Sequence, residues 1–437
     1  MAAMEPHLPA DSLSTAPDGP STAARDEARA GLYVHVPFCA TRCTYCDFSS
    51  GALSHDTLER YLNALAIEVP SRAESARGTR FTSVFFGGGT PSALASRHFA
   101  AVMRLLRDHF EIANGAEITL EANPESVRPA LLDAWAAGGV NRLSMGAQSF
   151  DPGELAKLGR IHSVDRPAEA VRLARTHGFG RLSLDLMFGF PEHTPERFAA
   201  TLDRALACGV EHLSAYCFIP EPGTPLGDAA LSGRAALPSA EEQADLYESL
   251  TLRVSVAGMS CYETSNFCRP GAEARHNVGY WLRRPYLGLG PSAHSLLGGL
   301  RFGNHYAAAR WAEALERGAS PESERETESD ASVAEEIVML GLRLGNGLIP
   351  RDYAAKDWNA VRGRYGAALD HAVAASRLER TSLGWRVPRR LRFVADECIA
   401  WVAARERRPI RRPVWFDTAS AVPIMIEPCS SLPSPAI

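Results

Sequence analysis

The stretch Cys39-Ala-Thr-Arg-Cys43-Thr-Tyr-Cys46 places three cysteines within eight positions, in the order C-x3-C-x2-C, just after an apolar run at 32–36. Thiols this close in sequence cannot usefully pair with one another as disulfides, and they suit a single soft metal centre. A structural tetrahedral site uses four protein ligands, so three thiolates leave one coordination position open to a molecule that reacts. The stretch therefore predicts a reactive metal centre at the end of a strand.

Apolar runs and helical patterns alternate from this stretch to about residue 220. The runs expected to form strands are 32–36, 81–86, 118–122, 140–145, 181–187 and 212–218. The helical patterns lie near 56–77, 92–109, 128–137, 166–177 and 194–208. Gly138, Gly178 and Gly209 follow three of these patterns, as helix C-caps would. Six strands separated by helices predict a parallel sheet, either open or curled into a barrel.

Residues suited to binding and chemistry fall at the C-terminal ends of these expected strands. In parallel sheets that alternate with helices, active sites collect at that edge. The cysteines follow the first strand, and the other five strands carry, in order, residues 87–91, Glu121, Gln148, Asp185, and Tyr216 with Cys217. We therefore expect one site at this edge, assembled from all six strands.

Composition and charge exclude several classes of protein. The 437 residues carry a formal net charge of −5, which gives no reason to expect nucleic acid or an acidic membrane surface as a partner. The sequence contains no run of about 18 apolar residues that would predict a membrane span. Nine cysteines without a signal peptide predict a protein of the reducing cytosol rather than a secreted disulfide framework.

Changes in pattern along the chain predict five regions. They are a disordered leader at 1–29, a core barrel at 30–225, an accessory segment at 226–324, an α-rich domain at 325–405 and a disordered tail at 406–437. The accessory segment is expected to contain a helix near 238–257, followed by loops. The two ends are rich in Pro and lack a hydrophobic period, which is typical of disorder. In the α-rich domain, the first helical pattern begins at Glu335.

Spacing alone leaves two interpretations of the cysteine loop. Its thiols could hold a [4Fe–4S] cluster with one iron open or, together with His35, a structural zinc ion in a Cys3His set. The polar residues at the neighbouring strand ends favour the cluster, because a structural zinc ion would not need them. We expect His35 to orient the loop through a hydrogen bond instead.

Seven motifs then identify a resemblance. They are YVHVPFCATRCTYCDF (33–48), FFGGGTPS (85–92), ITLEANPES (118–126), NRLSMGAQSF (141–150), LGRIH (158–162), LDLMFGFP (184–191) and EPGTP (221–225). In this order they resemble the radical S-adenosylmethionine (SAM) enzymes of the oxygen-independent coproporphyrinogen oxidase family, from about residue 31 to 398. The resemblance implies a partial (β/α)6 TIM-like barrel, followed here by a smaller α-rich C-terminal domain. It also implies a [4Fe–4S] cluster on Cys39, Cys43 and Cys46, whose open iron binds SAM and cleaves it to a radical.

The resemblance assigns roles to the residues at the strand ends. Glu121 would bind the ribose hydroxyls of SAM, and Arg160 would pair with its carboxylate. The glycine run would let a ligand approach the backbone closely, since glycine has no Cβ. Without the resemblance, Asp185 and Arg160 could equally form an ion pair at the barrel rim. The remaining cofactor-binding residues would be Tyr33, Phe48, Gly88, Gly89, Thr90, Gln148 and Asp185.

Two departures separate this chain from the decarboxylating members of the family. Those enzymes carry a further cysteine two residues beyond the third ligand, where this chain has Phe48, and an N-terminal arm with a Pro-Arg-Tyr-type motif, which the leader lacks. The departures favour the HemW branch, described as heme chaperones. That branch carries an HNxxYW motif, which residues His276 to Trp281 match.

The HNxxYW motif makes His276 the implied heme ligand. An imidazole with one face open is a good axial donor to heme iron, and the neighbouring Tyr280 and Trp281 could pack on a flat macrocycle. A histidine beside aromatic residues is also a common structural arrangement. The resemblance implies a heme chaperone that transfers heme to acceptor proteins. The alternatives are oxygen-independent decarboxylation of coproporphyrinogen III and another radical modification of a tetrapyrrole.

Overall fold

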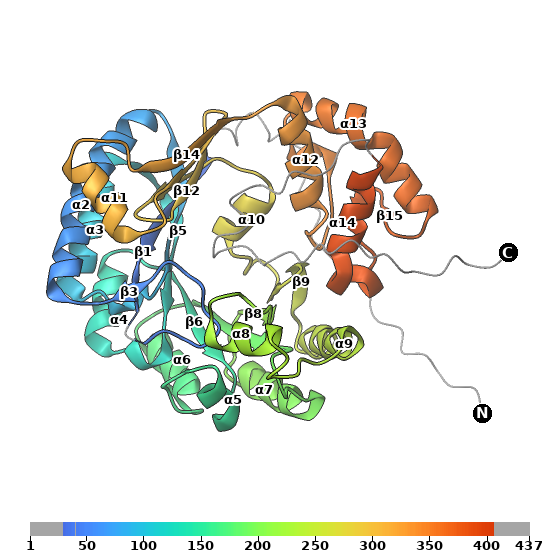
Figure 1. The fold of residues 1–437 in the computed structure, drawn as a ribbon, viewed down its shortest axis with the longest axis horizontal. Helices are drawn as coiled ribbons and strands as arrows, with labels where there is room; N and C mark the ends of the chain where they lie inside the picture. Colours follow the sequence, from blue (N-terminus) through green and yellow to red (C-terminus); the bar gives the residue numbers. More distant parts are fainter. Residues whose placement is uncertain (1–28, 40, 406–437) are drawn as a thin grey trace.

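The computed structural model describes residues 29–39 and 41–405. The predicted leader and tail lie outside the described residues, except for Arg29 at the leader's end. The described chain forms a twelve-stranded sheet in the order β14-β13-β12-β11-β1-β4-β5-β6-β7-β8-β10-β9, drawn in Figure 1. Its centre is parallel and consists of β1 (Arg29–Val36), β4 (Arg80–Gly88), β5 (Glu111–Ala122), β6 (Arg142–Gln148), β7 (Arg181–Phe188) and β8 (His212–Cys217).

Helices connect these parallel strands and cover the outer face of the sheet (Figure 1). They are α2 (His55–Ser75), α3 (Ser96–His109), α4 (Pro129–Ala137), α6 (Arg166–Thr176) and α7 (Pro195–Ala207), with the short α5 (Pro152–Lys157) and the 3-10 turns Pro91–Ala93 and Pro124–Ser126. Local residues explain their ends. Ser54 starts α2 with a capping box, and Gly178 and Gly209 follow α6 and α7 with positive φ. Gly138 is the C-cap of α4, as predicted, and the left-handed residue that follows it is Gly139.

In the accessory segment 226–324 the helix predicted near 238–257 is present as α9 (Ala240–Val256), and the part after it is far more regular than the loops predicted there. On one edge of the sheet, β11 (Tyr286–Leu289) pairs parallel to β1 and continues into antiparallel β12 (His294–Leu297), β13 (Leu300–Asn304) and β14 (Glu322–Thr327). On the other edge, β10 (Asn266–Cys268) and β9 (Ser260–Glu263) add antiparallel strands. Its other helices are α8 (Pro225–Leu231), α10 (Arg275–Trp281) and α11 (Ala308–Glu316). The sheet therefore extends past the six expected strands on both sides.

The remaining described residues form a helical unit with its own core. Buried side chains such as Ile337, Leu369 and Val402 pack into a hydrophobic cluster separate from that of the sheet. Its first helix begins at Asp330, earlier than the predicted Glu335, because Ser329 caps it through Ser332. The unit consists of α12 (Asp330–Gly341), α13 (Ala355–Ala374), α14 (Ala395–Ala404), the hairpin β15 (Glu379–Arg380) and β16 (Trp385–Arg386), and the 3-10 turns Pro350–Asp352 and Arg389–Val394.

Helix α10 lies between the sheet and this helical unit (Figure 1). It contacts β1 and β4 on one side and α12 on the other. Within the described part of the chain, no helix is both long and apolar enough to cross a membrane.

Candidate functional site

The cysteine loop leaves the C-terminal end of β1. Two short parallel strands, β2 (Phe38–Cys39) and β3 (Gly51–Ala52), hold the two ends of the loop together. The thiols of Cys39, Cys43 and Cys46 are free and half-buried. Burial and, to a lesser extent, the neighbouring thiols together raise the pKa of Cys46 to about 12. Among the described residues, no three His, Cys, Asp or Glu side chains already stand in an arrangement that could hold a metal ion.

Two hydrogen bonds connect the thiols to the end of β4 and to the connection between α5 and α6. The guanidinium of Arg160 donates from Nη1 to Cys43 Sγ at 3.4 Å, and the Thr90 hydroxyl donates to Cys39 Sγ at 3.5 Å. Donors of this kind suit sulfur that carries negative charge, as it does when it binds a metal. The donor set therefore fits a thiolate-bound centre that is soft and has fewer than four protein ligands.

His35 holds the loop in place and is not free to bind a metal. Its Nε2 lies 3.0 Å from the carbonyl oxygen of Ser49, so Nε2 must carry the proton, because a carbonyl only accepts. Nδ1 then accepts from the Tyr33 hydroxyl at 3.0 Å. Burial lowers the pKa of His35 to about 4, so the ring stays neutral. The predicted orienting hydrogen bond is confirmed, and the zinc alternative would have to break one of these two contacts.

Other atoms of the protein fill the space beside the glycine run at the end of β4. A Cβ on Gly88 would lie 2.6 Å from the His35 ring, and one on Gly89 would lie 2.7 Å from the Phe38 carbonyl oxygen. A Cβ on Gly87 would meet the rings of Phe85 and Tyr33. The close approach predicted at these glycines is therefore made first by the protein's own atoms. Because these glycines have no Cβ, residues of β1 and the start of the cysteine loop can pack against them.

Two carboxyl groups, Glu121 of β5 and Asp185 of β7, lie close enough to interact electrostatically. Burial and, to a lesser extent, the charge of Asp185 together raise the pKa of Glu121 to about 8. Asp185 accepts a hydrogen bond from Ser144 Oγ at 3.0 Å, and its pKa is also raised by burial. Arg160 donates instead to Asn123 Oδ1 and to the Gly146 carbonyl, both at 2.8 Å. The ion pair between Asp185 and Arg160, left open by the sequence, is therefore not among the contacts of the described residues.

Arg160 and Gln148 retain capacity to bind a ligand. The buried Nε of Arg160 has no hydrogen-bond partner among the described residues, although a guanidinium fork is well suited to a carboxylate. Gln148 ends β6 with φ of 63°, a conformation that costs a residue with a Cβ about 1 kcal/mol or more. Such strain is commonly kept where a side chain must point into a site.

His276 differs from the open imidazole that the sequence predicted. The ring is buried, with Nδ1 2.9 Å from Ser83 Oγ and Nε2 2.8 Å from the Tyr280 hydroxyl. It fills a space that exists because Gly31 has no Cβ, and burial lowers its pKa to about 3. An iron ligand at His276 would have to displace Ser83 or Tyr280.

A column of rings joins His276 to the cysteine loop. The His276 ring stacks on Phe85 with centroids 5.2 Å apart, and Phe85 stacks on Tyr33 at 6.2 Å. Tyr33 in turn hydrogen-bonds His35, which holds Ser49 in the loop. The sequence reasoning missed Phe85, although it alternates along β4 with core residues and precedes the glycine run.

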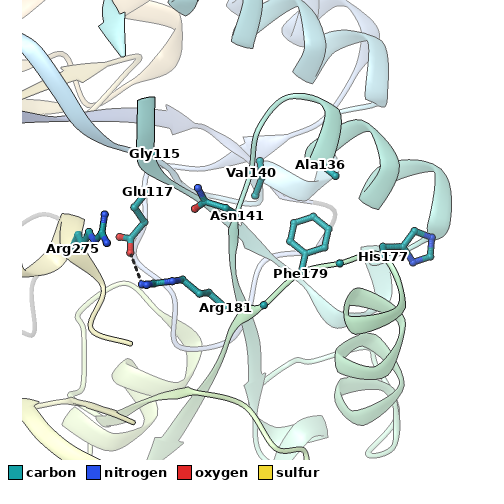
Figure 2. A pocket seen from close by; sticks show the side chains of 11 residues that line it. Gly115, Glu117, Ala136, Val140, Asn141, His177, Phe179, Arg181 and Arg275 are labelled. Carbon is teal, nitrogen blue, oxygen red and sulfur yellow. Dashed lines mark ion pairs between the residues drawn. The ribbon is translucent and has the colours of Figure 1, made fainter. Parts of the chain in front are cut away.

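A cavity of 390 Å³ opens at the opposite end of the parallel strands (Figure 2). Arg181 at the start of β7 and Arg275 at the start of α10 point toward Glu117 of β5. Arg181 Nη1 lies 3.8 Å from Glu117 Oε2, and the His276 backbone N–H donates to Glu117 Oε1 at 3.2 Å. The sequence reasoning missed this cavity because it examined only the C-terminal strand ends.

Comparison with known proteins yields consistent matches. The model of the radical SAM superfamily matches residues 33–205. Heme chaperone HemW of Mycobacterium tuberculosis is 40% identical over 324 residues, which are 73% of this chain and 82% of that protein. Heme chaperone HemW of Bacillus subtilis is 32% identical over 77% of this chain and 89% of its own length. The mitochondrial radical S-adenosyl methionine domain-containing protein 1 of Bos taurus is 36% identical over 76% of both chains.

A solved structure shows the same fold. Coproporphyrinogen III oxidase (HemN) from Escherichia coli, described as a radical SAM enzyme, superposes with a TM-score of 0.74 at 24% identity. The superposition covers 87% of this chain and 91% of that one. The predicted fold class and the resemblance drawn from the seven motifs are both confirmed.

Proposed function

The chain belongs to the radical SAM superfamily and, within it, to the family of heme chaperones named HemW, and on this premise we propose that it binds heme and transfers it to acceptor proteins. The observation that carries the proposal is the 40% identity to HemW over 73% of the chain. Phe48 supports it, because it stands where decarboxylating relatives carry a further cysteine. The acceptors would be heme-binding apoproteins, and nucleic acid would have no part. The compartment would be the cytosol.

Membership of the superfamily implies a [4Fe–4S] cluster and SAM. We propose Cys39, Cys43 and Cys46 as the cluster ligands, since all three thiols are unpaired and Arg160 and Thr90 already donate to two of them. When bound, the cluster would supply an electron to SAM. His35 would fix the loop in the orientation that ligation requires.

SAM would lie between the cysteine loop and the carboxylates inside the barrel. The unpartnered Nε of Arg160 supports its role toward the SAM carboxylate, and the buried Glu121 could accept hydrogen bonds from the ribose hydroxyls. The strained backbone of Gln148 supports a binding role for its amide. The other residues proposed around SAM are Tyr33, Phe48, Gly88, Gly89, Thr90 and Asp185.

His276 is the proposed axial ligand of heme. Its low pKa supports this role, because only a neutral imidazole can donate to iron, and burial keeps this ring neutral. One of its hydrogen bonds, to Ser83 or Tyr280, must open for iron to bind. Heme binding would therefore require α10 to shift relative to β1 and β4.

Anaerobic reconstitution with iron and sulfide tests the cluster. The wild-type protein should become brown and carry about four iron atoms, and Cys43→Ser should lose both the colour and the iron, because one of three protein ligands is gone. Colourless protein with stoichiometric zinc would contradict the proposal.

The heme function is tested on the same reconstituted protein. With SAM and a reductant, we expect saturable heme binding followed by transfer to an apoprotein, without consumption of coproporphyrinogen III. Formation of protoporphyrinogen would favour the decarboxylase alternative, and a methylated or ring-opened tetrapyrrole would favour another radical SAM enzyme. Heme titration of His276→Ala then tests the ligand, since unchanged affinity would remove the heme assignment from that residue.

A further inference from the structure

We propose that the cavity between Arg181 and Arg275 binds a carboxylate group, and that its occupant is the propionate-bearing edge of heme. This proposal rests on the proposed function for the identity of the ligand, whereas the cavity itself does not depend on it. The cavity drawn in Figure 2 lies at the N-terminal ends of β5, β6 and β7, whereas the cysteine loop follows the C-terminal end of β1.

The charges around the cavity favour an anion. Two guanidinium groups flank one carboxyl, and Glu117 is only 3% exposed. One carboxyl cannot cancel two positive charges, so the site keeps an excess of positive charge even where Glu117 is ionised. Burial raises the pKa of Glu117, and the charges of Arg142, Arg181 and Arg275 offset part of that shift. Glu117 Oε2 has no hydrogen-bond partner among the described residues and is in ionic contact only with Arg181, at 3.8 Å. A second carboxylate could therefore be received by the two arginines without removing a strong existing pair.

Arg275 has the freedom that such a role needs. Its side chain is exposed and forms no hydrogen bond or ion pair within the described chain, although its charge acts on Glu117. A guanidinium presents two parallel N–H groups to a carboxylate, so a free arginine beside a cavity is well suited to this group. Arg181 is 35% exposed and can turn one N–H toward the cavity while keeping contact with Glu117.

The walls of the cavity indicate what the carboxylate is attached to. Phe179, Val140 and Ala136 contribute apolar surface, so an anion on an apolar body fits better than a free inorganic ion. Arg275 also lines a second cavity of 260 Å³, together with Tyr280, Tyr286 and Leu282. The two cavities therefore share one arginine at the start of the helix that carries His276.

Heme matches this combination of surfaces. It is a flat apolar ring with two carboxylates on one edge, and the two cavities offer aromatic and aliphatic walls beside arginines. Glu117 connects the carboxylate end to the proposed iron ligand, because it accepts the backbone N–H of His276. Binding at Arg275 would thus act directly on the helix that must move to free the imidazole.

The test compares heme with its dimethyl ester, in which both carboxylates are esterified. We expect Arg275→Gln to weaken heme binding roughly tenfold or more, the effect of losing one charge-assisted hydrogen-bonded pair, and to leave ester binding unchanged. Arg181→Lys keeps a charge beside Glu117 but loses the fork, so it should weaken heme binding less. Arg253→Gln, which removes an arginine of α9 that pairs with Asp203 of α7, is the matched control and should change neither affinity. SAM binding of every variant checks that the barrel has folded.

The outcomes separate this inference from the proposed function. Equal affinity of the wild type for heme and its ester, or heme binding by Arg275→Gln at the wild-type level, would overturn the propionate site. If the wild type bound no heme at all, the proposed function would fail. In that case a titration with citrate would test the cavity as a carboxylate site. Citrate binding by the wild type that is lost in Arg275→Gln would assign the cavity to a free carboxylate. If the wild type did not bind citrate, the carboxylate site would be overturned.

Discussion

At the scale of single residues, strain marks the proposed SAM site. Five non-glycine residues of the described chain have positive φ, and Gln148 is the one that ends a central parallel strand. A side chain in this conformation costs about 1 kcal/mol or more. The conformation turns the amide of Gln148 toward Gly146 and Arg160, since a Cβ on Gly146 would lie 2.9 Å from Gln148 Nε2.

Gln148→Gly should therefore separate stability from binding. Glycine relieves the backbone strain of the folded state but gives the unfolded chain more conformational entropy. These two effects oppose each other, so the free energy of unfolding should rise by no more than about 1 kcal/mol. The affinity for SAM should fall, because the amide is gone. Ser376→Gly is the matched control: φ is 55° there, far along the chain from the proposed site, so stability should respond alike while SAM affinity stays unchanged. Urea unfolding and SAM titration measure both, and unchanged SAM affinity in Gln148→Gly would contradict the assignment.

Glu121 gives the protein a specific dependence on pH. Its folded pKa, about 8, lies above the value of an exposed carboxyl because of burial and the charge of Asp185. Between the two pKa values the folded state binds more protons than the unfolded state, so the free energy of unfolding falls as pH rises from about 4.5 to 8. Glu121→Gln cannot ionise, so its stability relative to wild type should increase over that range and level off above it.

Urea unfolding across this pH range measures the difference between wild type and Glu121→Gln. Asp185 also has a raised pKa and contributes a decline of the same sign, but both proteins keep it, so it largely cancels in the comparison. A difference that is constant with pH would show that Glu121 is ionised in the folded protein throughout. Glu121→Gln should also weaken SAM binding at pH 8 and above, where only the wild type presents a carboxylate.

At the scale of elements, local signals determined what the sequence could predict. The six central strands were predictable because each is an apolar run followed by a helix with its own caps, such as Ser54 and Gly178. Strand β14 has the sequence ESERET, which carries no apolar pattern. It is held in the sheet by its pairing with β13, which is not adjacent to it in the sequence. Helix α10 is seven residues long and is held by contacts with β4 and α12. Its buried His276 could not be foreseen from sequence, because Ser83 lies 193 positions away.

The glycine run also makes contacts that the sequence could not reveal, although its motif was recognised. The sequence correctly marked residues 87–89 as a place of close approach, but not which atoms approach. In the structure the His35 ring fills the space beside Gly88, so β4 and β1 fit together before any ligand arrives. The contact is between elements, and one sequence position cannot reveal it.

Gly88→Ala should separate the cost of a clash with the His35 ring from the cost of placing alanine at a positive φ. Gly88 has φ of 104° and a new Cβ would lie 2.6 Å from His35, whereas Gly178 has φ of 86° and open space around it. Gly178→Ala should cost about 1 kcal/mol for the backbone alone, and Gly88→Ala should cost more because the ring must move. Only Gly88→Ala should also lower the iron content after reconstitution, since His35 holds the cysteine loop. Equal losses of stability with full iron content in both variants would contradict the proposed role of His35.

At the scale of the molecule, α10 joins the barrel to the helical unit. Its first half places His276 against Phe85 inside the barrel, and its last residue, Trp281, lies in the core of the helical unit. A buried network reinforces the junction: Arg283 and Arg301 both pair with Glu336 of α12, at 2.8 and 2.7 Å. Movement of α10 that frees His276 must therefore also disturb the packing of α12. The helical unit is in this sense part of the proposed heme site.

Trp281→Ala tests that coupling against a closely matched variant. Trp281 and Trp385 are 8% and 7% exposed and belong to the same hydrophobic cluster, but only Trp281 is part of α10. Each change to alanine should lower the free energy of unfolding by about 3–5 kcal/mol, the usual cost of an emptied aromatic site. Loss of Trp281 also removes its packing between α10 and the core of the helical unit. The hydrogen bonds of His276 should therefore open more easily, and heme should bind faster. Trp385→Ala should leave the rate of heme binding unchanged, as measured by stopped-flow absorption. If both variants bind heme at the wild-type rate, the helical unit does not restrain α10, and access to His276 is set by Ser83 and Tyr280 alone.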